Sequence, residues 1–161
     1  MTYRTVRRVL AHEYPKYRKH LKALDMDSKV LRFANPLTDE VIDNLCDKWE
    51  ADHEHNILFC IENDDLDFIA VGHIAIEEEG MELAFSVHKG YQGQGMGSLL
   101  MKRCIQWCRT HNFLHGNMVC LSTNSIIKHL CLKHGIHMEH DHGETLADIH
   151  LDHPSFQTYW K

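Results

Sequence analysis

Apolar residues recur along this chain with two alternating periods, and the order of the periods predicts the order of its secondary structure elements. Short runs with alternating or continuous apolar positions predict strands at about residues 3–10, 57–62, 68–76, 81–87, 118–121, 136–139 and 146–151. Apolar residues spaced three and four apart predict helices at about residues 15–24, 38–49, 96–111 and 124–134. The elements follow one another as β-α-α-β-β-β-α-β-α-β-β, which predicts a mixed α/β fold.

Cap and turn residues support these boundaries. Thr38 is placed to cap the second helix, and Ser122 or Thr123 to cap the fourth. The polar turns at 63–65 and 79–80 are short, which predicts that the strands they join are antiparallel.

The composition favours one folded domain spanning residues 1–161, because the length is typical of a single domain and the chain is 43% apolar and 25% charged. No apolar run is long enough for a membrane span and no signal peptide is evident, so we expect a cytoplasmic protein. The six cysteines lack the C-x-x-C spacing of zinc and redox sites, which predicts reduced, mostly buried thiols. A net charge of −6 argues against a nucleic-acid surface and favours cationic partners.

Glycines gather at the junction between the predicted strand 81–87 and the next helix. The segment Gln92-Gly93-Gln94-Gly95-Met96-Gly97-Ser98 can bring several backbone N–H groups close to one anion, and a diphosphate is the expected ligand. A Walker loop would need Lys where Met96 stands, and a dinucleotide-binding loop would need Gly where Ser98 stands. On the glycines alone, an ordinary glycine-rich turn stays open as an alternative.

Two motifs resemble the signatures of the GNAT acetyltransferase superfamily. The run Gln92–Gly97 resembles its acetyl-CoA motif Q/R-x-x-G-x-G/A, and Asn124, Leu130, Gly135 and Ile136 stand where the family has its second signature, N-…-L-Y-…-G-F. The resemblance implies the GNAT fold, which is a mixed, mostly antiparallel twisted sheet of six to seven strands with about four flanking helices. It also implies a splay between the fourth and fifth strands, and acetyl-CoA as co-substrate.

The same resemblance implies which residues would hold acetyl-CoA. The loop from Gln92 through Gly93, Gln94, Gly95, Met96 and Gly97 to Ser98 would bind the pyrophosphate. The strand backbone at Phe85, Ser86 and Val87 would pair with the pantetheine arm, and Asn124 would reach it from the opposite side.

Catalysis needs a group that deprotonates the acceptor amine, since a lysine-like amine has a pKa of about 10.4. Glu82 stands where several GNAT enzymes carry a catalytic glutamate, and its alternative role is an exposed strand carboxylate. Cys131 stands where many members place a tyrosine that protonates the leaving sulfur. Three roles stay open for Cys131, namely an inert core thiol, a general acid and a covalent acetyl carrier.

The sequence therefore predicts an N-acetyltransferase that transfers an acetyl or short acyl group directly to a primary amine in a ternary complex. The acceptor is open among protein amines, polyamines and small molecules, and the acidic loop 139–144 favours a cationic one. The alternatives are a non-catalytic acyl-CoA sensor and, because of 15 histidines, a metal-binding protein. The histidine spacings match no recognised metal motif, so we expect no metal. A homodimer is left open.

Overall fold

A computed structural model describes residues 4–120, 124–140 and 146–153. Its seven strands form one sheet, in chain order β1 (Arg7–Arg8), β2 (Asn56–Glu62), β3 (Phe68–Glu77), β4 (Gly80–Val87), β5 (His115–Val119), β6 (Ile136–His140) and β7 (Leu146–Leu151). The α-helices are α1 (Tyr14–Lys22), α2 (Met26–Phe33), α3 (Asp39–Ala51), α4 (Met96–Thr110) and α5 (Ser125–Lys133). The strands are ordered β1-β2-β3-β4-β5-β7-β6 across the sheet, and only the β4–β5 pair is parallel. This topology confirms the predicted mixed, mostly antiparallel sheet.

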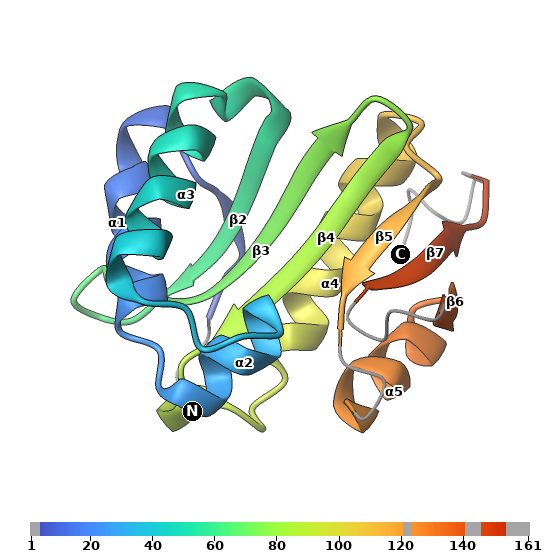
Figure 1. The fold of residues 1–161 in the computed structure, drawn as a ribbon. Helices are drawn as coiled ribbons and strands as arrows, with labels where there is room; N and C mark the ends of the chain where they lie inside the picture. The colour runs from blue at the N-terminus through green and yellow to red at the C-terminus, as the bar shows by residue number, and fades with distance from the viewer. Residues whose placement is uncertain (1–3, 121–123, 141–145, 154–161) are drawn as a thin grey trace.

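Helices cover both faces of the sheet (Figure 1). The helices α1 and α3 lie together over β2 and β3, α4 crosses the opposite face, and α2 lies over the end of β4. Strand β2 is buried on both faces, because Leu58 and Cys60 pack under α1 and α3 while Ile57, Phe59 and Ile61 pack toward α4. This double burial explains why β2 appears in the sequence as a continuous apolar run rather than an alternating one.

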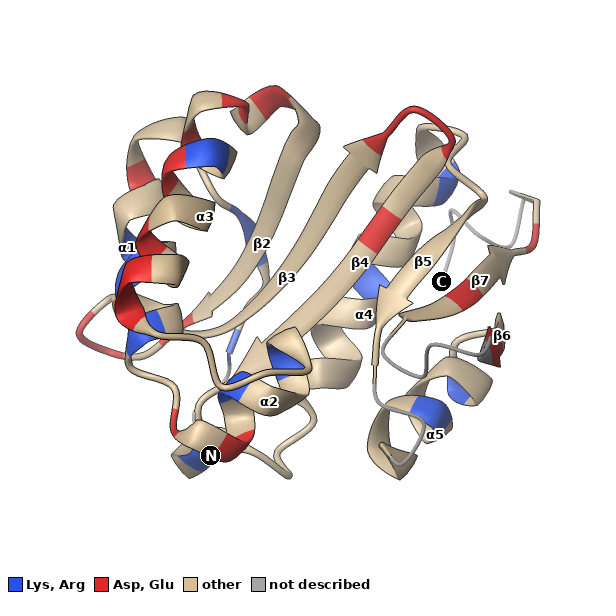
Figure 2. Ribbon diagram, viewed as in Figure 1, with Lys and Arg blue, Asp and Glu red and all other residues tan. Residues whose placement is uncertain are grey.

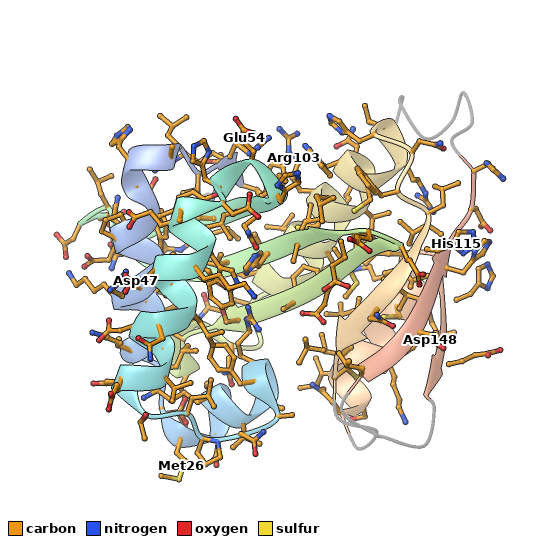
Figure 3. The ribbon with its side chains drawn as sticks, turned by 45° about the horizontal axis from the view of Figure 1, so that its top comes forward. Met26, Asp47, Glu54, Arg103, His115 and Asp148 are labelled. Atoms are coloured by element: carbon orange, nitrogen blue, oxygen red, sulfur yellow. The ribbon has the colours of Figure 1, made fainter. Side chains whose placement is uncertain are left out.

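The helix α2 is missing from the predicted order, so the described chain has five α-helices where the sequence predicts four. Its pattern is inverted: the polar residues Ser28 and Arg32 are buried, whereas Met26 and Leu31 are 70% and 40% exposed. Met26 projects outward from the molecule in Figure 3. Met26, Val30 and Phe33 do recur at helical spacing, but the helix has only eight residues, and periodicity identifies a helix reliably only over about 10–12 residues.

Several boundaries also differ from the prediction. The first strand is confined to Arg7–Arg8, and residues 1–3 lie outside the described part of the chain. Strand β5 begins at His115 and not at Met118, because Gly116 approaches the β4 backbone so closely that a Cβ atom there would collide with the Met81 carbonyl. His115, Gly116 and Asn117 have no apolar side chain, so the apolar run that marks this strand in the sequence begins only at Met118.

The cap of α5 differs as well. Asn124 caps this helix by accepting a hydrogen bond from the Ile127 amide at 3.2 Å. The predicted caps, Ser122 and Thr123, lie outside the described residues. Among the helices that the structure describes, none combines the length and apolar character that a membrane span needs.

Candidate active site

Strands β4 and β5 separate partway along their length. They pair only where residues 81–83 of β4 face residues 116–118 of β5, although β4 continues to Val87. Beyond Leu83, one edge of β4 therefore has no β5 partner, while its other edge remains paired with β3. This is the expected splay, and it leaves backbone groups that a ligand carrying amides can satisfy like a missing strand.

The glycine segment lies at the open end of the splay. Gly93 and Gly95 have left-handed backbone conformations, with φ of 78° and 82°, and Gly95 caps the N-terminus of α4. The first turn of α4 therefore presents N–H groups that have no partner within the helix, together with the positive end of the helix dipole. Both features favour a bound anion.

A cavity of about 330 Å³, which we call the glycine-loop cavity, lies beside this turn. Ten of the eleven residues expected to hold the cofactor line it, namely Phe85, Ser86, Val87, Gln92, Gly93, Gly95, Met96, Gly97, Ser98 and Asn124. Gln94 is the exception, and its side-chain amide donates to the Gly90 carbonyl at 3.4 Å. Ser28 and Leu31 of α2 complete one wall, which the sequence did not predict.

Some of these side chains stabilise the cavity instead of facing a ligand. The Gln92 amide donates to the Val87 carbonyl at 2.9 Å and to Ser28 Oγ at 3.0 Å, so it ties the loop to β4 and α2. The Ser86 hydroxyl donates to His20 Nε2 at 2.8 Å on the opposite face of the sheet. Gln92 and Ser86 therefore offer chiefly their backbone groups to a ligand.

A second cavity of about 230 Å³, which we call the Glu82 cavity, lies between the sheet and the helices α2 and α3. Residues of the five elements α2, α3, β3, β4 and β5 line it, namely Arg32, Phe33, Leu45, Trp49, His73, Ala75, Glu82, Ala84 and Val119. Val119 also lines the glycine-loop cavity, so the two cavities meet at the splay.

Glu82 is the only acidic residue in β4 and appears as a red band across that strand in Figure 2. Burial raises the pKa of its carboxyl, Glu77 raises it further, and the opposing charge of Arg32 lowers it. A carboxylate with a raised pKa is a better proton acceptor than an ordinary glutamate. Its position in the wall of a cavity argues against the alternative of an exposed strand carboxylate.

A buried polar network supports the wall of the Glu82 cavity. The Arg32 guanidinium donates to the Tyr17 hydroxyl at 3.0 Å, and Tyr17 donates to His73 Nδ1 at 3.1 Å. The opposite nitrogen, His73 Nε2, donates to Asn56 Oδ1 at 2.9 Å. These directions require a neutral His73, and burial and then the Arg32 charge lower its pKa well below the usual value.

No sequence motif predicted this network. Its members come from α1, α2, β2 and β3, so no local motif connects them. The only signal in the sequence is that His73 and Asn56 each interrupt or adjoin an apolar strand run. Each position is compatible with either a satisfied core polar group or a functional one.

Cys131 lies on α5 and belongs to the apolar core, with 1% of its surface exposed. Its thiol points to Met118 Sδ at 3.7 Å, and burial raises its pKa to about 12. Among the described residues, it lines neither the glycine-loop cavity nor the Glu82 cavity. These observations favour the packing role over the general-acid and carrier roles.

The histidines near the C-terminus lie elsewhere. His115, His150 and His137 occupy neighbouring register positions on β5, β7 and β6, beside a cavity of about 530 Å³. Figure 3 shows His115 and Asp148 on the side of the molecule away from Asp47 of α3. In the described part of the chain, no group of three or more His, Cys, Asp or Glu side chains is arranged to hold a metal ion. Most of the acidic loop 139–144 lies outside that part.

Residues 19–136 match the model of the acetyltransferase (GNAT) family. The chain belongs to this family. No protein with a curated description matches the sequence.

Solved structures share the fold of this GNAT protein at low sequence identity. The GNAT domain of S. lividans PAT is 16% identical, with a TM-score of 0.71 over 91% of this chain and 89% of that domain. A putative acetyltransferase from Acinetobacter baylyi is 16% identical, with a TM-score of 0.69 over 95% and 97% of the two chains. Spermidine N-acetyltransferase from Vibrio cholerae, solved with CoA and spermine, is 15% identical, with a TM-score of 0.68 over 92% and 94%. At these identities, the similarity shows the fold alone.

Proposed function

We propose that this GNAT protein is an N-acetyltransferase that transfers an acetyl group from acetyl-CoA to a primary amine within a ternary complex. One observation carries the proposal: the glycine-loop cavity and the Glu82 cavity meet at Val119, in the splay between β4 and β5. Two substrates, one in each cavity, would therefore bring their reacting groups together beside Val119.

The glycine-loop cavity fits the co-substrate. The amides around Gly95 at the N-terminus of α4 would bind the pyrophosphate, and the edge of β4 beyond Leu83 would pair with the pantetheine arm. Acetyl-CoA supplies an activated thioester carbonyl. The described residues thus provide an anion site and an amide-binding edge in the order that an extended phosphopantetheine chain requires.

The Glu82 cavity provides the base. Glu82 takes a proton from the ammonium, and the neutral amine then attacks the thioester carbonyl. The N–C bond forms, the C–S bond breaks and CoA leaves as a thiolate, which takes the second amine proton through solvent. The raised pKa of Glu82 narrows its gap to an amine pKa of about 10.4, which favours this proton transfer.

A steady-state assay tests the proposal. CoA release is measured with acetyl-CoA and a panel of lysine peptides, polyamines, aminoglycosides and amino acids, and both substrates are varied. A ternary complex predicts intersecting lines and no acetylated enzyme by intact mass. Tight acetyl-CoA binding by calorimetry with no CoA release for any amine would instead support a non-catalytic acyl-CoA sensor.

A further inference from the structure

Arg32 is a buried cation without an anionic partner. It is 5% exposed, and no carboxylate in the described part of the chain lies within ion-pair distance of its guanidinium. Its Nε atom is buried and has no hydrogen-bond partner among those residues. Burial of an unpaired charge is costly, so its persistence needs a reason.

The side chains in direct contact with the Arg32 guanidinium are neutral. The guanidinium lies over the rings of Phe33 and Trp49, at 4.5 and 5.6 Å from the ring centroids. It donates to the Tyr17 hydroxyl at 3.0 Å and contacts His73 Nδ1 at 3.3 Å. These contacts orient the guanidinium without neutralising it.

Glu82 does not fill the missing role. Among the described residues it is the only acidic side chain lining the same cavity, and it does not lie within ion-pair distance of Arg32. A Glu82 that accepts a proton from the substrate amine would lose its negative charge. The cation in the opposite wall would then face a cavity with no negative charge in its walls.

Apart from Arg32, Glu82 and the neutral His73, the walls of the cavity are apolar. Phe33, Leu45, Trp49, Ala75 and Ala84 surround a space of about 230 Å³, which is below the range of about 300–1,000 Å³ typical of pockets for drug-sized ligands. The cavity thus combines a cation, a carboxyl that can act as a base and apolar walls around a small volume.

We propose that the acceptor amine carries a carboxylate that pairs with Arg32, so that the substrate class is small amino acids with an apolar or aromatic side chain. This inference rests on the proposed acetyl transfer. The carboxylate forms a charge-assisted, two-pronged contact with the guanidinium, and the amine lies toward Glu82 and the splay. A polyamine would instead place a second positive charge against Arg32.

Matched substrate pairs test the proposal. Phenylalanine is compared with 2-phenylethylamine, and leucine with 3-methylbutylamine, so that each pair differs only in the carboxylate. We expect the wild-type kcat/KM ratio of amino acid to amine to fall about 10- to 100-fold in Arg32→Gln, mainly through the KM of the amino acid. The ratio of the two kcat/KM values measured on one preparation does not depend on how much of the protein is folded. The intrinsic difference in reactivity between the two substrates is the same for both enzymes, so it cancels when their ratios are compared.

Tyr17→Phe is the matched control, since it removes a hydrogen bond from Arg32 but keeps the charge. It should leave the substrate ratio unchanged even if both rates fall. If Arg32→Gln lowers both members of a pair equally, Arg32 is only structural and the proposal is overturned. A wild-type preference for polyamines or for the amines without a carboxylate also overturns it.

Binding without chemistry separates this inference from the proposed function. Calorimetry measures 3-phenylpropanoate and 4-methylpentanoate, which keep the carboxylate but lack the amine. Binding to the wild type that weakens about 10-fold or more in Arg32→Gln supports the carboxylate site, even if no amine is acetylated. Failure of both acids to bind the wild type overturns the site, whatever the turnover assay shows.

Discussion

The glycine-loop cavity and the Glu82 cavity both have Val119 in their walls, but the first is formed mainly by backbone and the second by side chains. The first is formed largely by backbone, with left-handed glycines, the start of α4 and the unpaired edge of β4. The second is formed by side chains from α2, α3, β3 and β4. A backbone-built site can bind a ligand that many proteins share, whereas a site built from side chains can select one acceptor.

The two cavities also differ in the kind of charge they present. The glycine-loop cavity offers the partial charge of a helix N-terminus, which is exposed and diffuse. The Glu82 cavity contains the full charge of a buried guanidinium beside a carboxyl with a raised pKa. Changes in the first should therefore affect co-substrate affinity, and changes in the second should affect turnover and substrate choice.

The largest expected effect comes from Gly95→Asp. An aspartate at the N-cap of α4 places negative charge where the pyrophosphate is expected to bind, and such like-charge contacts cost several kcal/mol. We expect acetyl-CoA affinity to fall on the order of 10³-fold in calorimetry. Unchanged affinity in a folded variant would contradict the proposal that acetyl-CoA binds in this cavity.

Two controls separate charge from strain in that experiment. Gly95→Ala imposes the same left-handed conformation, with φ of 82°, on a residue that tolerates it less well than aspartate. Because alanine adds no negative charge, Gly95→Ala should retain more acetyl-CoA affinity than Gly95→Asp, even though its backbone is more strained. Gly90→Asp adds the same charge to the preceding turn at a glycine that lines neither cavity, and it should bind normally.

The next largest effect is expected on the other side of the splay. Glu82→Gln preserves the shape of the side chain but removes the base, so kcat should fall on the order of 10²-fold while acetyl-CoA affinity stays similar. The wild-type rate should also fall at acidic pH, with an apparent pKa above that of an ordinary glutamate, because burial raises the pKa of Glu82. Equal rates for the two proteins, with chemistry rate-limiting, would remove Glu82 from the mechanism.

Glu77→Gln is the matched control for that variant. Glu77 is exposed at the end of β3, and its charge contributes to the raised pKa of Glu82. Its removal should shift the acidic limb of the rate profile to lower pH without a large loss of kcat. A loss as large as that of Glu82→Gln would indicate a general charge effect and not a specific base.

The difference between a cavity formed by backbone and one formed by side chains explains which of them the sequence could predict. The glycine loop is one contiguous segment, and its physical role depends on residues that have no side chain. The motif and its location between β4 and α4 could therefore both be predicted from the sequence. The Arg32 site could not, because α2 buries its polar face and its partners lie on three other elements. The proposed acceptor site therefore could not be predicted from any local segment of the sequence.

The strands show a similar division. Boundaries set by local turns, such as those of β3 and β4, agree with prediction within one residue. The start of β5 depends on Gly116 approaching Met81, a contact between segments far apart in the sequence, and it was placed three residues too late. Glu82 was proposed as the base from its position in a strand. Its burial and its proximity to Arg32 depend on tertiary structure and could not be predicted from the sequence.

Each cavity has a neutral buried histidine close to it. His20 accepts a hydrogen bond from Ser86, which lines the glycine-loop cavity, and His73 in the wall of the Glu82 cavity accepts one from Tyr17. Burial, followed by the effect of His88, lowers the pKa of His20 to about 3. Below a pH of about 6.5, the unfolded chain binds a proton that the folded chain excludes, so this histidine's contribution to stability is lost as the pH falls toward 3.

We therefore expect His20→Asn to lose less stability than the wild type on acidification. Between about pH 7 and pH 5, the excluded proton at His20 should cost the wild type about 2 kcal/mol in free energy of unfolding, and the variant should be spared this loss. Urea unfolding at both pH values measures the difference. His12→Asn, which changes an exposed histidine, should behave like the wild type. An identical fall in all three proteins would show that His20 is not held neutral.

The smallest effect is expected from Cys131→Ala, which tests whether either cavity extends to this thiol. Because Cys131 is buried and points to Met118, its loss should lower the free energy of unfolding by about 1 kcal/mol and change kcat by less than about twofold. Cys108→Ala is the matched control, since Cys108 is another buried thiol whose pKa burial raises to about 12. A kcat several-fold lower in Cys131→Ala than in Cys108→Ala would restore the general-acid role. Loss of all turnover, together with an acetylated wild-type enzyme by intact mass, would instead establish a covalent carrier and overturn direct transfer.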